Sequence, residues 1–307
     1  STNIGYTMST TNQGGQSEDS GSVFWFVDNI PSIYPLFLRD ANGNIPNNIY
    51  GSPAYDYGET GRGFGGLTNS IADAHYTLEQ AKRQEISTNS SFNIKFTKDL
   101  TFETKIGTQY WERKFDNMNN KYYGPSAGTK GSIYKTDTQM FTYDVLKMLR
   151  YKKTFGVHDL EVLAAHQNNN YQYKFMDASK SQLALPLPEF EQAAVNIGAN
   201  SYTDNVRLES YFAQANYDFD NRYYFTGTVR RDGSSRFLND KWGTFYSVGA
   251  AWNLTNEAFM KDQTILSNLK LKTSYGLTGE QDGVGLYPGY DRYNTETGAG
   301  GTSSFVF

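Results

Sequence analysis

A period-two alternation of apolar and polar residues between Glu209 and Leu254 constrains the fold of this chain more than any other feature. From Tyr211 to Phe219 the odd positions are apolar or aromatic, while the even positions are mostly polar. The alternation resumes from Tyr223 to Arg230 and again from Trp242 to Leu254. Because successive side chains of a strand point to opposite faces, the pattern predicts three consecutive two-faced strands.

The connections between these strands are of two kinds. Asp220 and Asn221 predict a tight turn, and Asp232-Gly233-Ser234-Ser235 is a longer turn-rich segment. The same alternation predicts further strands at residues 4–10, 83–96, 100–113, 136–151, 158–167 and 269–278. Long loops are expected at residues 11–69, 114–131 and 168–204, and a single helical turn is expected at residues 257–260.

Short and long connections alternate along the chain, so one end of the predicted sheet has turns and the other has loops. This asymmetry is typical of an up-and-down transmembrane β-barrel with about eight or nine strands present. A soluble sandwich shares the period of two but more often has shorter strands and Greek-key connections.

Trp242 and Trp252 lie ten residues apart on the same predicted face. Ten residues at about 3.3 Å, tilted near 40°, rise about 25 Å, which is the height of an outer-membrane apolar band. The two rings are therefore predicted to lie in opposite aromatic girdles. The alternative is that both belong to the core face of a soluble sheet.

Composition excludes several classes of protein. No apolar run approaches the ~18 residues of a transmembrane helix, and the absence of cysteine excludes a disulfide scaffold and thiol chemistry. A net charge of −4 with scattered Lys and Arg leaves no basic face for nucleic acid. The chain opens in polar residues without a signal peptide, so we expect a mature form or an internal piece.

Three consecutive segments resemble the barrel strands of the SusC/RagA family of TonB-linked outer-membrane transporters. They are SYFAQANYDFDNRYYFTGTVRRDGSSRF, KWGTFYSVGAAWNLTNEAF and LSNLKLKTSYGLTGEQ, supported by LRYKKTFGVHDLEVLAAHQ and PSIYPLFLRDANGN. The resemblance covers most of residues 70–290. Its departures are Gln214, Tyr246 and Glu280, where Arg, Pro and Asn are common in the family.

The resemblance implies a Gram-negative outer-membrane importer of oligosaccharides or peptides, without enzymatic activity or a cofactor. Its implied partners are the TonB complex, reached through an N-terminal region, a SusD-like surface lipoprotein and outer-membrane lipid. No plug domain, TonB-box region or closing C-terminal strand is visible in residues 1–307. We therefore expect a partial TonB-dependent receptor barrel domain. A soluble β-rich glycan-binding protein is the alternative.

Aromatic residues in the predicted loops are the candidate substrate contacts. They are Trp25, Tyr122, Tyr123, Tyr171 and Tyr173. Aromatic rings can stack on sugar rings or peptide side chains, or they can pack the loops together.

Arg230, Asp232, Gly233 and Arg236 form a second candidate group. One interpretation is a charged ligand contact. We favour the other, a structural motif in which Asp232 accepts backbone hydrogen bonds in a turn and the arginines pair across strands.

No metal site is predicted. His75, His158 and His166 are too widely separated to form a ligand set. Asp40 to Asn44 resembles a calcium loop only faintly, because no glutamate closes it, and a turn is preferred. No nucleophile motif is present.

Overall fold

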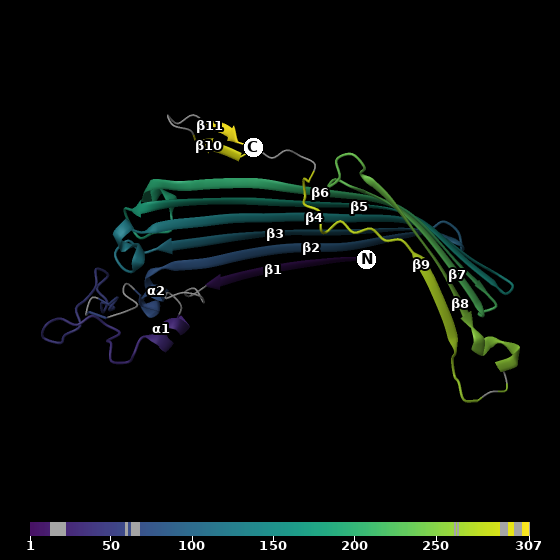
Figure 1. Cartoon of the computed structure of the whole chain (residues 1–307), viewed down its shortest axis with the longest axis horizontal. Coiled ribbons are helices and arrows are strands. Elements are labelled where there is room, and N and C mark those ends of the chain that lie inside the picture. The colour runs from purple at the N-terminus through teal and green to yellow at the C-terminus, as the bar shows by residue number, and fades with distance from the viewer. Residues whose placement is uncertain are drawn as a thin grey trace.

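The computed structural model describes residues 1–12, 23–58, 61–62, 68–260, 262, 264–288, 294–297 and 303–306. Nine strands form one antiparallel sheet in chain order, with a strongly twisted, open shape (Figure 1). They are β1 (Thr2–Asn12), β2 (Leu78–Lys95), β3 (Leu100–Asn119), β4 (Ser132–Phe155), β5 (His158–Leu183), β6 (Ala193–Phe219), β7 (Tyr223–Ser234), β8 (Trp242–Asn253) and β9 (Lys270–Gly276). The predicted up-and-down antiparallel arrangement is confirmed, and the sheet of this chain does not close on itself.

Short elements occupy the connections. Two helices lie in the long segment before β2, and a separate two-stranded sheet follows β9. These elements are α1 (Val23–Asn29), α2 (Ser70–Tyr76), η1 (Pro125–Thr129), η2 (Phe190–Gln192), η3 (Leu254–Asn256), η4 (Ala258–Met260), β10 (Asn294–Thr297) and β11 (Ser303–Val306). Across the described residues, no helix combines the length and apolarity that a bilayer crossing needs.

The turn end of the sheet matches the sequence prediction closely. Residues 220–222 connect β6 to β7; Asp220 and Asn221 both have positive φ, 54° and 52°, and Arg222 N donates to the Phe219 carbonyl at 3.0 Å, a turn geometry suited to twisted strands. Gly156, with φ 61°, lies in the two-residue connection between β4 and β5. The helical turn predicted at residues 257–260 is present as the 3₁₀ segment η4. Figure 1 shows these connections at one end of the sheet and α1 and α2 at the other, which we call the loop end.

The prediction of a loop at residues 168–204 is wrong. Strand β5 continues to Leu183 and β6 begins at Ala193, so the connection between them is residues 184–192. Likewise, β3 extends to Asn119, inside the loop predicted from residue 114. The amide- and tyrosine-rich sequence of this region lacks apolar alternation, yet backbone pairing with a neighbouring strand needs no such alternation.

Strand register gathers the predicted apolar positions on a single face. Directly opposed residues of antiparallel strands share a face. One transverse row runs Phe102, Leu149, Ala164, Ala213, Val229 and Tyr246 across β3 to β8. Parallel rows add Ile106 with Val145 and Val248 with Tyr275.

This apolar face is open to the surroundings. Val248 and Phe225 are 56% and 54% exposed, and Tyr275 is 65% exposed. The apolar spans are nine to eleven residues long, as at 100–110 in β3, 211–219 in β6 and 242–252 in β8. That is the length a tilted strand needs to cross a bilayer. We name it the outer face, and the opposite face the inner face.

Substitutions on the two faces should differ in cost. Val248→Arg places a charge on the outer face near the middle of its span and should destabilise the folded barrel by about 2 to 4 kcal/mol. Thr228→Arg, on the inner face of the adjacent strand, should cost much less. Equilibrium unfolding of the complete barrel in lipid vesicles measures both, and equal losses would contradict this assignment of faces.

Glu257 ties the turn end together. The residue is 8% exposed, and its carboxylate accepts hydrogen bonds from Tyr223 Oη at 2.6 Å, Trp252 Nε1 at 2.9 Å and Arg222 Nη1 at 3.2 Å. These donors, the Tyr223 hydroxyl first, lower the pKa of the Glu257 carboxyl below its usual range. The carboxylate thus links the β6–β7 turn to the connection between β8 and β9.

Glu257→Gln should destabilise the turn end in a pH-dependent way. Because the folded-state pKa of Glu257 is depressed, its contribution is present above the pKa of the unfolded carboxyl and is lost as pH falls through the folded value. The wild type should therefore melt higher than the variant at neutral pH, and the gap should close in acid. Thermal unfolding in detergent across pH measures this, and a gap that is independent of pH contradicts it.

Candidate functional site

The inner face carries the charged and polar side chains of the sheet. Arg150 Nε donates to Glu103 Oε1 at 3.0 Å, and Arg150 also pairs with Glu161 on the neighbouring strand. Thr226 Oγ1 lies 2.7 Å from Asn216 Oδ1, and Gln167 Nε2 donates to Asp144 Oδ2 at 2.8 Å. Such cross-strand networks suit a wall that faces water.

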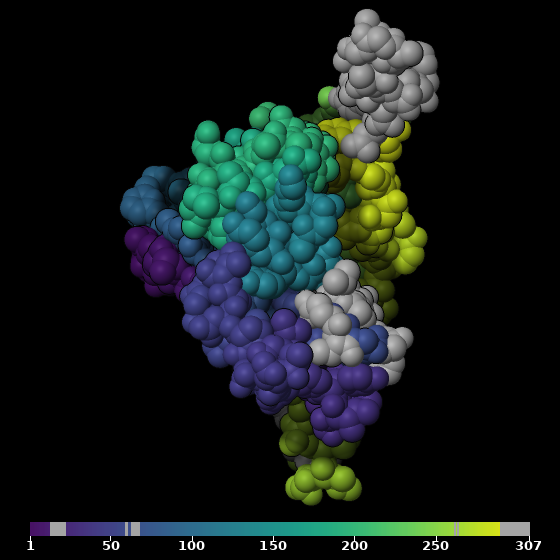
Figure 2. Space-filling view, turned by 90° about the vertical axis from the view of Figure 1, so that its left-hand side faces the viewer, coloured from purple at the N-terminus to yellow at the C-terminus, as the bar shows by residue number. Residues whose placement is uncertain are grey.

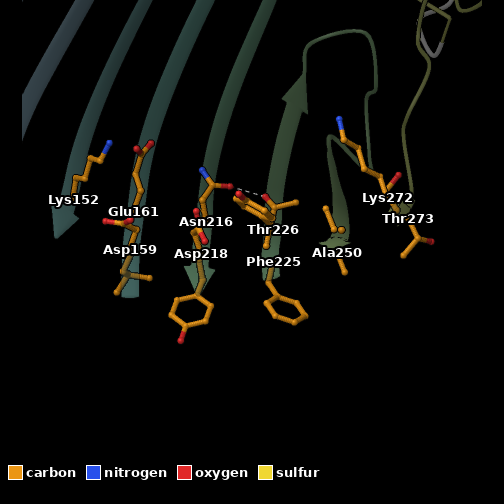
Figure 3. Close-up of a pocket in the computed structure, with 16 residues that line it drawn as sticks. Lys152, Asp159, Glu161, Asn216, Asp218, Phe225, Thr226, Ala250, Lys272 and Thr273 are labelled. Atoms are coloured by element: carbon orange, nitrogen blue, oxygen red, sulfur yellow. Dashed lines mark hydrogen bonds between the residues drawn. The ribbon is translucent and has the colours of Figure 1, made fainter. Parts of the chain in front are cut away.

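A groove of about 550 Å³ runs over this inner face across β4 to β9. Figure 3 shows Glu161, Asn216 and Thr226 on one side of the ribbons, with the Phe225 ring pointing the opposite way. Lys152, Asp159, Asp218 and Lys272 add charges of both signs to its lining. The groove can hold water and polar solutes, and the chemistry of its lining favours passage or binding.

Tyrosine rings gather at the loop end, where two segments far apart in sequence meet. Tyr50, Tyr55 and Tyr76 precede β2, and Tyr122 and Tyr123 follow β3. The Tyr76 and Tyr123 rings stack with centroids 4.7 Å apart, and Tyr50 lies 5.8 Å from Tyr76 and 6.4 Å from Tyr122. Figure 2 views this end, where the purple and blue N-terminal segment lies beside the teal and green hairpin ends. We call these five residues the tyrosine cluster.

Hydrogen bonds hold the tyrosine cluster in place. Asn120 Nδ2 donates to Tyr50 Oη at 3.1 Å and to the Tyr76 carbonyl at 3.1 Å, and Asn48 bonds the Tyr76 hydroxyl. Burial raises the pKa of Tyr76, so its hydroxyl stays protonated. Beside the cluster, burial also raises the pKa of Asp73, although the Tyr57 hydroxyl donates to it at 2.8 Å.

A cleft of about 520 Å³ opens beside the cluster. Tyr50, Tyr55 and Tyr76 line it with His75 and Asn120. Aromatic faces next to amide donors are suited to flat or ring-shaped polar ligands. This cleft is the principal candidate site.

The structure brings together only some of the residues that were predicted to contact substrate. Tyr122 and Tyr123 lie in a loop, as predicted, and belong to the tyrosine cluster. Tyr171 and Tyr173 lie within β5, so their assignment to a loop is wrong. Trp25 lies in α1 and not in a loop either.

Tyr173 belongs to a different group of rings on the inner face, beyond the apolar spans. Its centroid is 6.5 Å from that of Trp111 and 6.1 Å from that of Tyr202, and Tyr202 lies 5.3 Å from Phe175. Trp111, Met140 and Tyr173 are directly opposed on β3, β4 and β5. We call Trp111, Tyr173, Phe175 and Tyr202 the inner aromatic row.

The outer face changes from apolar to charged at the level of the inner aromatic row. Beyond the apolar spans, the outer face of β3 and β4 carries ion pairs between Lys114 and Glu112 at 3.4 Å and between Lys135 and Asp116 at 3.2 Å. Charged side chains belong in water, so this part of the sheet lies above the apolar band. The long strands therefore form a wall that extends past the membrane.

Sequence reasoning missed Tyr50, Tyr55, Tyr76, Trp111 and Tyr202. The tyrosines before β2 stand in a segment without periodicity, and only the fold brings them to the β3–β4 connection. Trp111 and Tyr202 did carry a usable signal, because each lies on the polar face of its strand.

The Arg230 group is a network of side chains at the loop end of β7. Arg230 Nε contacts Asp232 Oδ1 at 2.7 Å and Oδ2 at 2.9 Å, and its Nη2 donates to Ser210 Oγ at 3.0 Å. Arg236 Nη1 donates to the carbonyls of Gln281 at 3.0 Å and Val284 at 2.8 Å. Asp232 and Gly233 lie inside β7, not in the predicted turn, and Asp232 accepts from an arginine side chain.

Gly233 and the two tryptophans illustrate close packing on the outer face. A Cβ on Gly233 would lie 3.0 Å from the Trp242 ring, so only glycine lets the indole lie across this backbone. Arg231 stacks over Trp242 at 5.4 Å, and Tyr223 stacks on Trp252 at 6.4 Å. The rings stand at opposite ends of β8, and their role in girdles stays a prediction.

Within the described residues, no group of three or more His, Asp or Glu side chains is arranged to hold a metal ion. His166 instead stacks on Tyr211 and contacts Glu209, and His158 contacts the Tyr217 hydroxyl at 2.7 Å. Asp40 accepts from the amides of Asn42 and Asn44 at 2.9 and 2.8 Å, which is the turn preferred from sequence.

Arg230→Lys tests whether the Arg230 group is structural. A lysine cannot reproduce the paired contacts with Asp232, but the pair is partly exposed, so the loss of stability should stay below about 1 kcal/mol. The affinity of the complete protein for its ligand should be unchanged. Chemical unfolding and equilibrium binding measure the two quantities, and an affinity loss of tenfold or more would point to a ligand contact.

Comparison with known proteins places this geometry in a family. The family of TonB dependent receptor-like β-barrels matches residues 17–305. The TonB-dependent receptor SusC of Bacteroides thetaiotaomicron is 30% identical over 224 residues, covering 70% of this chain and 21% of that protein. TonB-dependent receptor P3 of Formosa agariphila is 29% identical over 220 residues, covering 69% of this chain and 22% of that receptor.

Solved structures agree with the sequence comparisons. A structure of the RagAB peptide transporter superposes with a TM-score of 0.75 over 99% of this chain and 34% of that one, at 22% identity. That likeness shows a shared fold. The chain spans about a fifth of the length of these curated relatives.

Proposed function

Because this chain belongs to the TonB-dependent receptor-like β-barrel family, we propose that it works as part of an active importer of oligosaccharides or peptides. The chain is a segment of an outer-membrane β-barrel of the SusC/RagA type. Its family consists of receptors and transporters, which is a different class from enzymes. The soluble glycan-binding alternative is set aside, since it conflicts with this membership.

The contrast between the two faces of the sheet is the observation that carries the proposal. An exposed apolar face with spans of nine to eleven residues suits lipid, and an inner face lined by ion pairs and amides suits a hydrated lumen. A wall of this kind can enclose a path for polar solutes. The loop end then faces the outside of the cell, where long loops are found in such barrels.

We assign the energy supply for import and the capture of substrate to two partner proteins. The curated relatives are TonB-dependent receptors by name, which supports coupling of this protein to the TonB complex. The structural relative is named the RagAB peptide transporter, and the SusC/RagA resemblance of the strands supports a SusD-like surface lipoprotein at the loop end. Both partners are proposals for this chain.

Substrate contact is assigned to aromatic residues at and near the loop end. The sequence set of Trp25, Tyr122, Tyr123, Tyr171 and Tyr173 is kept as a proposal, and the cleft beside the tyrosine cluster extends it. Tyr50 and Tyr122 are 45% and 41% exposed, so their faces are available to a ligand. Sugar rings and apolar peptide side chains both stack on such faces.

The proposal of active import is tested by uptake. Cells carrying the complete transporter should accumulate labelled oligosaccharides or peptides, and depletion of TonB should abolish accumulation while leaving the barrel folded in the outer membrane. Accumulation that persists without TonB, or is absent for every member of a mixed glycan and peptide panel, would reject active import.

The double variant Tyr50→Ala with Tyr122→Ala tests the exposed rings of the tyrosine cluster, of which Tyr50 lines the cleft. Losing two stacking faces worth about 1 kcal/mol each should weaken substrate binding roughly tenfold or more, with no change in the amount of folded barrel. Isothermal titration on the assembled transporter measures the affinity. The control is Ile33→Ala, which truncates an 82% exposed residue of the same segment. Equal affinity for the double variant and the control would move the site away from this cleft.

A further inference from the structure

Strand β6 extends well past its neighbour β7. On one side, β6 pairs with β5 all the way to Ala193. On the other side, pairing with β7 begins only at Leu208, opposite Ser234. Between these limits, β6 has no strand of the described chain along its second edge. Figure 1 shows β6 at the border of the block of long strands.

The last hydrogen bonds on this edge reveal the direction of its backbone groups. Arg207 N donates to Ser235 Oγ at 2.9 Å, and Ser235 N donates to the Arg207 carbonyl at 2.9 Å. Asn205 N donates to the Tyr287 hydroxyl at 2.9 Å. Alternate residues of a strand direct their N–H and C=O groups to the same side. The backbone groups of Ala199, Ser201 and Thr203 therefore point along this free edge, and all three residues are exposed.

The free edge has a definite length. At the end nearer the β7 pairing, the amide of Asn205 already donates its hydrogen bond to the Tyr287 hydroxyl. At the end nearer Ala193, a register shift between Ser179 and Lys180 marks a bulge opposite residues 196–198. Bulges terminate regular pairing. Between them lie residues 199–203, which span roughly 17 Å at about 3.3 Å per residue. We call this stretch the β6 edge.

Among the described residues, the side chains of the β6 edge itself do not block pairing with a further strand. Residues 193–203 include no charged residue and no proline, the two usual devices that protect an exposed edge from pairing. Ala199, Ser201 and Thr203 share one face, and their side chains are small. On the inner face Tyr202 is 47% exposed and packs near Phe175 and Tyr173. An added strand would thus have a small-residue side and an aromatic side.

We propose that the β6 edge binds an extended peptide as an added β-strand, with a peptide side chain on the inner face resting on the Tyr202 ring, which Phe175 supports from β5. Backbone bonds to Ala199, Ser201 and Thr203 supply affinity that depends little on sequence, and the Tyr202 ring selects an apolar side chain. The inference rests on the proposed function, because it assumes that the loop end faces external substrate. It deepens that function by naming the substrate as a peptide.

Two observations favour a free peptide over other occupants. A sugar chain lacks the regular alternation of N–H and C=O that complements a strand edge, so it cannot form the ladder. A strip about 17 Å long and one strand wide, roughly 10 Å with side chains, offers about 170 Å², far below the ~800 Å² per partner of a stable protein complex. The edge therefore suits a short ligand of about five to seven residues.

Ser201→Pro tests the ladder in the complete transporter. Proline removes the Ser201 donor from the free edge and is tolerated where the N–H faces away from the sheet. The matched control is Ser201→Ala, which leaves the backbone donor in place. Fluorescence anisotropy with a labelled heptapeptide of alternating Ser and Val should show at least tenfold weaker binding to Ser201→Pro and unchanged binding to Ser201→Ala.

A second measurement leaves the protein unaltered. The same heptapeptide with alternate backbone nitrogens methylated keeps its side chains but cannot complete the ladder, so it should bind wild type at least tenfold less tightly. Maltoheptaose should not displace the peptide. Equal binding of the methylated peptide, equal binding by Ser201→Pro, or displacement by the sugar would overturn the proposal.

The proposal of peptide binding at the β6 edge and the proposal of active import can fail independently. TonB-dependent uptake combined with any of the contrary binding results would reject the β6 edge and leave import standing. Ladder-dependent peptide binding without TonB-dependent uptake would confirm the edge and reject import.

Discussion

Backbone hydrogen bonding between neighbouring strands is the interaction on which the rest of this structure depends. In hydrocarbon no water can satisfy a peptide N–H or C=O, so each must bond to the next strand. The unbroken ladder from β1 to β9 meets this requirement over the apolar spans. Register follows from the ladder, and a slip of one residue would exchange the outer and inner faces.

Along each long strand the side chains change character while the ladder continues. Tyr110 ends an apolar span in β3, and Lys114 and Asp116 follow on the same face. At that level the inner face becomes aromatic, with Trp111 opposite Met140 and Tyr173 beyond it. The surrounding medium explains the change. Lipid demands an apolar exterior, whereas above the membrane both sides meet water and the inner side is free to serve ligands.

Two kinds of candidate aromatic site result, and they differ in the elements that hold them. The tyrosine cluster depends on a segment before β2 packing against the β3–β4 connection, secured by Asn120 and Asn48. The inner aromatic row is held by strands and their ladder, so its ring spacing follows from sheet geometry. A site on strands is positioned more accurately, whereas a site on loops can adapt to the ligand.

Period-two alternation and the Asp220-Asn221 turn were sufficient to predict consecutive antiparallel strands from sequence, because side chains of a strand alternate between its faces. The preference for a membrane barrel over a soluble sheet came from the asymmetry of the connections and the family resemblance. The extent of β5 and β6 was decided by tertiary structure, since Asn168 to Tyr173 pair through their backbones without any apolar pattern. Ring partners such as Tyr76 with Tyr123 were also decided there, because residues far apart in sequence meet only after the sheet has formed.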